Sequence, residues 1–278
     1  MNARRSSDWS KPAAHVVIWI VAAVLLLPLF WLVVGSLKTN NVIFQFPPAW
    51  LPHPVEWSNY IQAVRDITFF TYARNSIIIA VFSVVGTLLS VPLVAYGFSR
   101  IRWSGRTIFF FIMLSTAMLP FQATMIPLYI IYRDIGWLNT FYPLIVPAFF
   151  SSAFLAFLLR QFFLTIPQEL SEAATMDGAG HFTILYRIII PLAKPGLATI
   201  AIFSFVNAWT EFQAPLIFLT SNNKYTLSLG LQSYQSLHST AWAYLMAGST
   251  LYLLPVAIVF FIAQRQFIGG INLSGVQG

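Results

Sequence analysis

Six apolar segments, each long enough to cross a lipid bilayer, divide this chain of 278 residues. A membrane-spanning helix needs about 20 mostly apolar residues, because the bilayer offers no water to satisfy backbone polar groups. Only 8% of the residues are charged, whereas soluble domains carry about 25%. We therefore expect an all-α, polytopic membrane protein that forms a single domain over residues 1–278. The expected spans are about 15–37, 72–98, 107–132, 138–163, 195–219 and 243–267.

Prolines occur within these segments, and those of the third, fourth and sixth bear on how the helices are built. The third span contains Pro120 and Pro127, which predict a kink or a break because proline cannot donate the helical backbone hydrogen bond. The fourth span has Pro143 and Pro147 near its start, and the sixth contains Pro255. Such prolines are tolerated in membranes where neighbouring helices or a cavity satisfy the freed carbonyl groups.

The distribution of Lys and Arg predicts the orientation. With the N-terminus in the cytoplasm, ten of the 15 basic residues fall in inner segments and five in outer ones, as the positive-inside rule requires. Both termini and the loop over 164–194 are therefore expected in the cytoplasm. The net charge is +7, and the basic residues lie beside apolar runs along the chain. This distribution favours membrane topology and contact with lipid over nucleic-acid binding. The outer segment 38–71 contains several prolines with Trp50 and Trp57, so we expect an ordered connection at the outer interface.

The loop between the fourth and fifth spans has the pattern of two short helices separated by a bend. Glu169 and Glu172 favour the first turns of a helix that starts near Pro167, and Asp177-Gly178 is expected to end it, because glycine readily adopts a left-handed conformation. A second helix over 181–190 should end at Pro191 and Pro195. Four apolar residues of this second helix share one face at helical spacing: Phe182, Leu185, Tyr186 and Ile189.

This loop resembles the coupling loop of bacterial ABC-importer permeases, in which a cytoplasmic helix-turn-helix is held by an ATPase subunit. The residues that match that loop are Glu172, Ala173, Ala174, Gly178, Ile188, Ile190 and Pro191. One position departs from the family pattern, since Ile190 stands where leucine usually precedes the last proline. An isolated Glu-Ala-Ala would be a weak signal, and it is the full set before the penultimate span that carries the resemblance.

The resemblance covers nearly the whole chain and points to the carbohydrate-uptake branch, in its maltose-type second permease subunit. In the fifth span, Thr210 replaces the asparagine that usually follows the tryptophan. The matching stretches are Asn75-Ser76, Leu119-Pro120, residues 162–170, residues 207–212 with Pro215-Leu216, and the glycine-rich tail 270–278.

Several partners and residue roles follow from this resemblance alone. It implies half of a translocation pathway for a sugar or oligosaccharide in the inner membrane of a bacterial or archaeal cell. It also implies a different permease as heterodimer partner, an ABC ATPase dimer and an extracytoplasmic solute-binding protein. No catalytic residue, metal or cofactor is expected in this chain. The residues expected to contact the ATPase are Glu172, Ala173, Ala174, Asp177, Gly178, Pro191, Gly275 and Gly278.

Polar residues of the central spans are candidates for the translocation path. Amides and carboxylates can bind sugar hydroxyls, and an aromatic ring can stack on the C–H face of a pyranose. Two purely structural roles remain as alternatives, because polar side chains in spans also join helices and tryptophan also anchors spans at the interface. The path candidates are Gln122, Asn207, Trp209, Thr210, Glu211 and Gln213.

Other classes of membrane protein fit the sequence less well. A membrane enzyme would need a buried catalytic or metal constellation, and the four histidines are scattered. An ion-coupled carrier usually has ionisable residues within its spans, where Glu211 is the only acid clearly placed. A permease of the same class for glycerol phosphate or a polyamine stays open as an alternative. The chain has no phosphate-binding Gly-x-x-x-x-Gly-Lys motif, so a separate subunit is expected to hydrolyse ATP.

Overall fold

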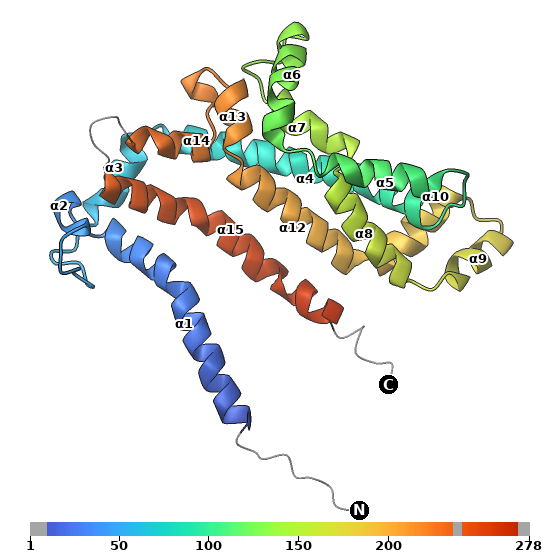
Figure 1. Cartoon of the computed structure of the whole chain (residues 1–278), viewed down its shortest axis with the longest axis horizontal. Coiled ribbons are helices and arrows are strands. Elements are labelled where there is room, and N and C mark those ends of the chain that lie inside the picture. The colour runs from blue at the N-terminus through green and yellow to red at the C-terminus, as the bar shows by residue number, and fades with distance from the viewer. Residues whose placement is uncertain (1–9, 236–240, 272–278) are drawn as a thin grey trace, which may run out of the picture. The chain divides into compact units, whose positions relative to one another are not determined.

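The computed structural model describes residues 10–235 and 241–271 of the chain. These residues are almost all helical, with no strand among them, which confirms the all-α prediction (Figure 1). Their contacts group into two compact units, which we describe one at a time. This grouping leaves the prediction of one domain over residues 1–278 untested.

Unit 1 comprises Met1–Ile67 and Leu231–Leu253. It holds the first predicted span and the start of the sixth. Within the described residues, its elements are α1 (Ser10–Ser36), α2 (Asn40–Ile43), α3 (Ser58–Arg65), η4 (Gln232–Tyr234) and the first part of α15 (Trp242–Ile271).

A buried lysine organises the connection that follows α1. The Lys38 ammonium donates a hydrogen bond to the carbonyl of Ala49 and lies 4.4 Å from the centroid of the Trp31 ring. The Asn59 side-chain amide donates to the carbonyls of Ser36 and Lys38 at 2.9 and 2.8 Å. Because these bonds join positions 11 to 23 residues apart, the connection is ordered, as predicted. Its place at the outer interface stays a prediction.

Unit 2 comprises Thr68–Gly230 and Leu254–Gly278. It contains the four central predicted spans and the predicted coupling loop. Its elements are α4 (Phe69–Ser99), α5 (Arg106–Thr116), α6 (Phe121–Asp134), α7 (Tyr142–Ile145), η1 (Val146–Phe150), α8 (Ala153–Thr165), α9 (Glu169–Met176), α10 (His181–Ile184), η2 (Leu185–Ile189), α11 (Ile190–Leu192), α12 (Lys194–Thr210), α13 (Gln213–Phe218), η3 (Asn222–Lys224), α14 (Leu227–Leu231) and the remainder of α15.

Four described segments are long and apolar enough to cross a membrane: Ala14–Ser36, Phe69–Ser99, Tyr142–Thr165 and Trp242–Gln264. They correspond to the first, second, fourth and sixth predicted spans. Two further candidates are sharply bent pairs, α5 with α6 at 91° and residues 181–192 with α12 at 83°. Taking each bent pair as one span raises the number to the predicted six.

The break in the third span confirms the prediction made from its prolines. α5 ends at Thr116, and Pro120 precedes α6 in an extended conformation with φ −67° and ψ 143°. Pro120 can start a helix but cannot supply the donor that would continue α5.

The fifth predicted span, 195–219, is too long at its C-terminal end. α12 stops at Thr210, and a separate helix, α13, begins at Gln213. A continuous helix would need Pro215 to donate a backbone hydrogen bond to the Glu211 carbonyl, and proline has no N–H. The Ser228 hydroxyl donates to that carbonyl instead, at 2.7 Å. The end of the span is therefore fixed by a residue that lies 17 positions further along the chain.

Candidate functional site

The first helix of the predicted coupling loop ends in a complete Schellman motif. Gly178 has φ +81°, a conformation that glycine adopts without steric cost. Its N–H donates to the Thr175 carbonyl at 3.0 Å, and the Ala179 N–H donates to the Ala174 carbonyl at 2.9 Å. These two bonds satisfy the last carbonyl groups of α9 and reverse the chain. The turn at Asp177-Gly178 therefore forms where the sequence places it.

The second helix of the loop is not a plain α-helix. Residues 185–189 form a π-helical turn, in which the Ile190 N–H donates to the Leu185 carbonyl. The wider register makes Ile184, Leu185 and Ile189 the buried residues. The predicted apolar face is therefore wrong for two of its members, since the side chains of Phe182 and Tyr186 are 73% and 53% exposed.

Pro191 does not end this second helix, contrary to the prediction. It is exposed and occupies the first turn of α11, which continues to Leu192. The chain bends instead at Ala193, before Pro195 in the first turn of α12.

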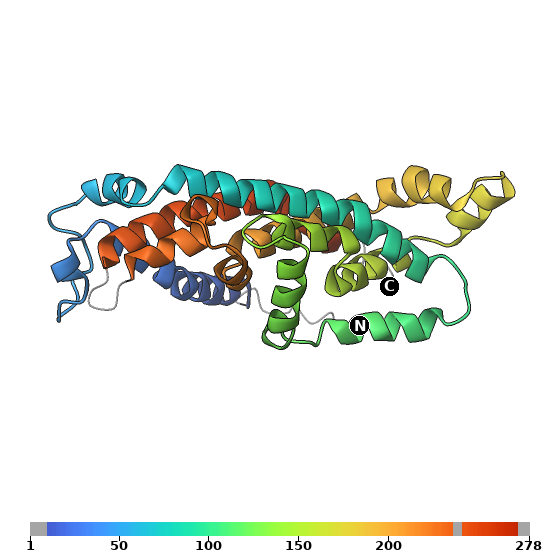
Figure 2. The same cartoon turned by 90° about the horizontal axis from the view of Figure 1, so that it is seen from above.

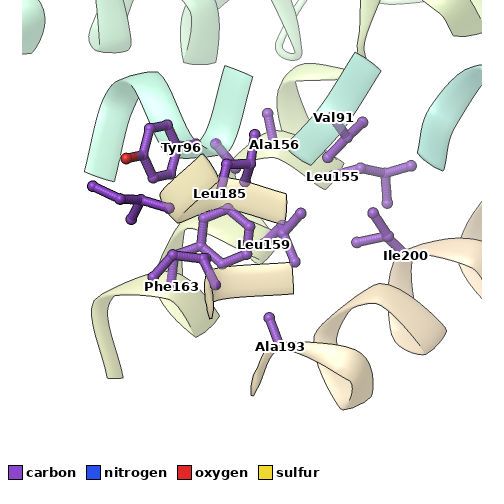
Figure 3. Close-up of a cluster of buried hydrophobic side chains, with 12 residues drawn as sticks. Val91, Tyr96, Leu155, Ala156, Leu159, Phe163, Leu185, Ala193 and Ile200 are labelled. Atoms are coloured by element: carbon purple, nitrogen blue, oxygen red, sulfur yellow. The ribbon is translucent and has the colours of Figure 1, made fainter. Parts of the chain in front are cut away.

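A buried apolar cluster anchors the loop to α4, α8 and α12 of unit 2. The loop contributes Ile184, Leu185 and Ile189, and Ala174 and Ala179 pack against the cluster from the turn. Figure 3 shows Leu185 directed toward Tyr96 and toward the α8 side chains. The members from the spans and from the bend before α12 are Val91, Ala95, Tyr96, Leu155, Ala156, Leu159, Phe163, Ala193 and Ile200.

Two arginines join the adjacent ends of α4 and α8, one reaching from the end of α4 to α8 and the other from α8 to α4. The Arg100 guanidinium, just after α4, donates to the carbonyls of Phe163, Ile166 and Pro167, where α8 gives way to the loop. Arg160 in α8 donates from Nε to the Phe98 carbonyl in the last turn of α4, at 3.0 Å. Burial lowers the pKa of Arg100, while nearby Tyr96 and Glu169 raise it. We call this pair of contacts the arginine clamp.

The sequence analysis missed the arginine clamp. No local pattern reveals these contacts, because the carbonyl acceptors of Arg100 lie 63 to 67 residues away along the chain.

The predicted ATPase-contact residues of the loop differ in exposure. Glu172, Ala173, Asp177 and Gly178 are exposed, and Ala174 is half-buried against the core. Exposed Met176 and Phe182 lie on either side of the turn and were not predicted to be contacts. The loop thus presents a small, mixed apolar and acidic surface at the end of unit 2 where α4 finishes (Figures 1 and 2). Gly275 and Gly278 lie outside the described residues.

A second candidate site is a cavity of about 720 Å³ between α4, α6, α8, α12 and α13 of unit 2. Of the predicted path residues, Asn207 and Glu211 line it. The Glu211 carboxylate accepts a hydrogen bond from the Ala214 N–H at 3.1 Å, at the start of α13. The hydroxyl residues around the cavity, most of which the prediction of the site left out, are Ser83, Thr87, Tyr132, Ser151, Ser152, Ser204 and Thr226.

The other predicted path residues do not line this cavity. Trp209 is buried and stacks on Phe205, with 5.8 Å between the ring centroids. Exposed Thr210 donates its hydroxyl hydrogen bond to the Val206 carbonyl of its own helix at 2.8 Å. Gln122 donates to Gln213 at 3.1 Å, which joins α6 to α13. The cavity thus brings together two of the six predicted residues.

Comparisons with known proteins agree with this architecture. A family model described as "Binding-protein-dependent transport system inner membrane component" matches residues 85–271. The chain is 31% identical to the sulfoquinovosyl glycerol transport system permease protein SmoH of Agrobacterium fabrum, over 96% of this chain and 94% of that protein. It is 32% identical to the arabinooligosaccharides transport system permease protein AraQ of Halalkalibacterium halodurans, over 93% of each.

A solved structure is also similar. It comes from a bacterial ABC transporter involved in the import of the acidic polysaccharide alginate. The similarity has a TM-score of 0.78 with 28% sequence identity, and it covers 95% of this chain and 99% of that one.

Proposed function

The chain belongs to the family of binding-protein-dependent transport system inner membrane components, and from this premise we propose that it forms half of the membrane pathway of an ATP-driven sugar importer. The observation that carries this proposal is the coupling loop. Its turn is fixed by the Schellman motif and its base by the buried cluster and the arginine clamp. A loop anchored in this way can pass a push from an attached subunit to α4, α8 and α12. The names of the relatives support a sugar or an oligosaccharide as the cargo.

The proposed assembly contains three further subunits, together with an external solute-binding protein and its cargo. A different permease completes the pathway as a heterodimer, and two ATPase subunits bind the coupling loops. In this chain, Glu172, Ala173, Ala174, Asp177, Gly178 and Pro191 form the contact, and Gly275 and Gly278 of the tail reach the ATPase. This subunit hydrolyses no ATP itself.

Reconstitution tests the proposed function. The chain, purified with its neighbours from its own membrane, is expected to bring an ATPase with it and to take up an oligosaccharide into liposomes only when ATP and the binding protein are present. The control omits ATP. Uptake by the chain alone, driven by an ion gradient, would instead identify a carrier.

The proposed topology places both termini in the cytoplasm. The chain has no cysteine, so a single introduced thiol reports its own side of the membrane. Ser104 and Asn223 are both exposed and lie in loops predicted on opposite sides. We expect Ser104→Cys to react with an impermeant thiol reagent only from the inside, and Asn223→Cys only from the outside. Reaction of both from one side would refute this topology.

A further inference from the structure

The cavity of unit 2 has walls that suit a sugar without charge. Its described lining offers hydroxyl groups, the Asn207 amide and five aromatic rings. Sugar hydroxyls hydrogen-bond to such polar groups, and the apolar faces of sugar rings pack on aromatic side chains. No Lys, Arg or His is among the lining residues that the structure describes, and Glu211 is the only carboxylate.

Ser151 is an unsatisfied polar group in this wall. Its hydroxyl oxygen is buried and has no hydrogen-bond partner among the described residues. Its backbone has φ 71° and ψ 154°, a region almost exclusive to glycine. Buried polar groups in proteins nearly always have hydrogen-bond partners. A hydroxyl group of a bound ligand could supply the partner that the Ser151 hydroxyl lacks.

The Glu211 carboxylate lies at the cavity wall with no paired cation among the residues that the structure describes. Its carboxylate is fixed by the Ala214 N–H, and the Ser228 hydroxyl fixes its backbone carbonyl. Within the described residues, the one ion pair is Arg133 with Asp134, which leaves Glu211 without one. An anionic cargo would therefore meet uncompensated repulsion in a medium less polar than water.

From these walls we infer that this half of the pathway passes uncharged sugars and disfavours acidic ones, a specificity that rests on the proposed function. The inference separates this chain from the similar alginate importer, which handles an acidic polysaccharide. It also disfavours the glycerol phosphate alternative. Glu211 acts here as a specificity-determining residue through its charge.

The charge inside the cavity can be measured directly in the assembled importer. Ser152 lines the cavity and makes no side-chain cap bond with α8, so Ser152→Cys provides a single thiol there. Relative to a free thiol in solution, we expect a cationic methanethiosulfonate to react at least about fivefold faster than an anionic one. The matched variant adds Glu211→Gln, which keeps an oxygen for the Ala214 N–H and removes the charge. It should abolish the preference.

A protection experiment then tests the cargo. An uncharged arabino-oligosaccharide should slow the modification of Ser152→Cys by a neutral thiol reagent, and an alginate oligosaccharide of equal length should not. Equal protection by both, a reagent ratio near one, or a thiol that no reagent reaches would overturn the inference. If the reconstituted importer showed no ATP-driven uptake while the thiol at position 152 still preferred the cationic reagent, the result would count against the proposed function alone.

Discussion

Replacing Gly178 with proline is expected to reduce ATP-driven uptake by about 100-fold. Proline fixes φ near −65°, whereas Gly178 has φ +81°, and proline also lacks the N–H that bonds to the Thr175 carbonyl. A proline in an incompatible position costs about 3 kcal/mol or more, which corresponds to about 100-fold in an equilibrium constant. The turn would then open and direct α10 away from its present position. Uptake and ATPase co-purification measure the effect.

Gly180 supplies a matched control for this prediction. A Cβ added at either glycine meets no atom within 4 Å, so crowding is absent at both. Gly180 has an ordinary φ of −75°, and Gly180→Ala should leave uptake close to wild type. Gly178→Ala keeps the N–H and should show an intermediate loss, because alanine at a left-handed φ costs about 1–2 kcal/mol. Equal activity of Gly178→Pro and Gly180→Ala would remove the turn from the mechanism.

Replacing Arg100 with methionine is expected to loosen the base of the coupling loop. The guanidinium binds the carbonyls of Phe163, Ile166 and Pro167, and each hydrogen bond from a charged group contributes about 1.5–3 kcal/mol. Because the outermost contact is exposed and long, we expect a loss of about 3 kcal/mol of local stability. Backbone amides from Gln168 to Ala179 should exchange with deuterium faster, and uptake should fall while the ATPase still turns over.

Arg102→Met controls for charge. Arg102 is exposed and lies in the same loop, so both variants remove one positive charge from the same side of the membrane. Any effect on membrane insertion should then be common to the two. The role of the clamp would be refuted if both variants gave the same exchange rates in the coupling loop.

The sequence predicts the parts of this structure that depend on short stretches of chain. Apolar segments about 20 residues long locate the helices, because the bilayer requires length and composition and little else. The break near Pro120 and the turn at Gly178 follow from the covalent restrictions of proline and glycine. These features need no knowledge of distant contacts, and the structure shows each of them.

The features that the sequence did not predict depend on residues far apart. α12 ends at Thr210 because Ser228 takes over the Glu211 carbonyl that Pro215 leaves open. Trp209 is buried against Phe205, although Asn207 and Ala208 just before it line the cavity of unit 2. The acceptors of Arg100 are equally remote. An i, i+3, i+4 pattern also assumes α-helical periodicity, so it could not place Phe182, which precedes the π-helical turn, or Tyr186, which lies within it.

Because of the π-helical turn at residues 185–189, the number of residues in the loop determines which way the preceding helix faces. Such a turn holds one residue more than the α-helical path between the same two points. Deleting one residue there would restore the α-helical register while rotating the preceding helix by about 100° about its axis. Phe182, now exposed, would swing away from the surface it shares with the Gly178 turn. Consider two permeases whose sequences match on both sides of this turn but whose turns differ in length by one residue. They would therefore present different helix faces to the same ATPase.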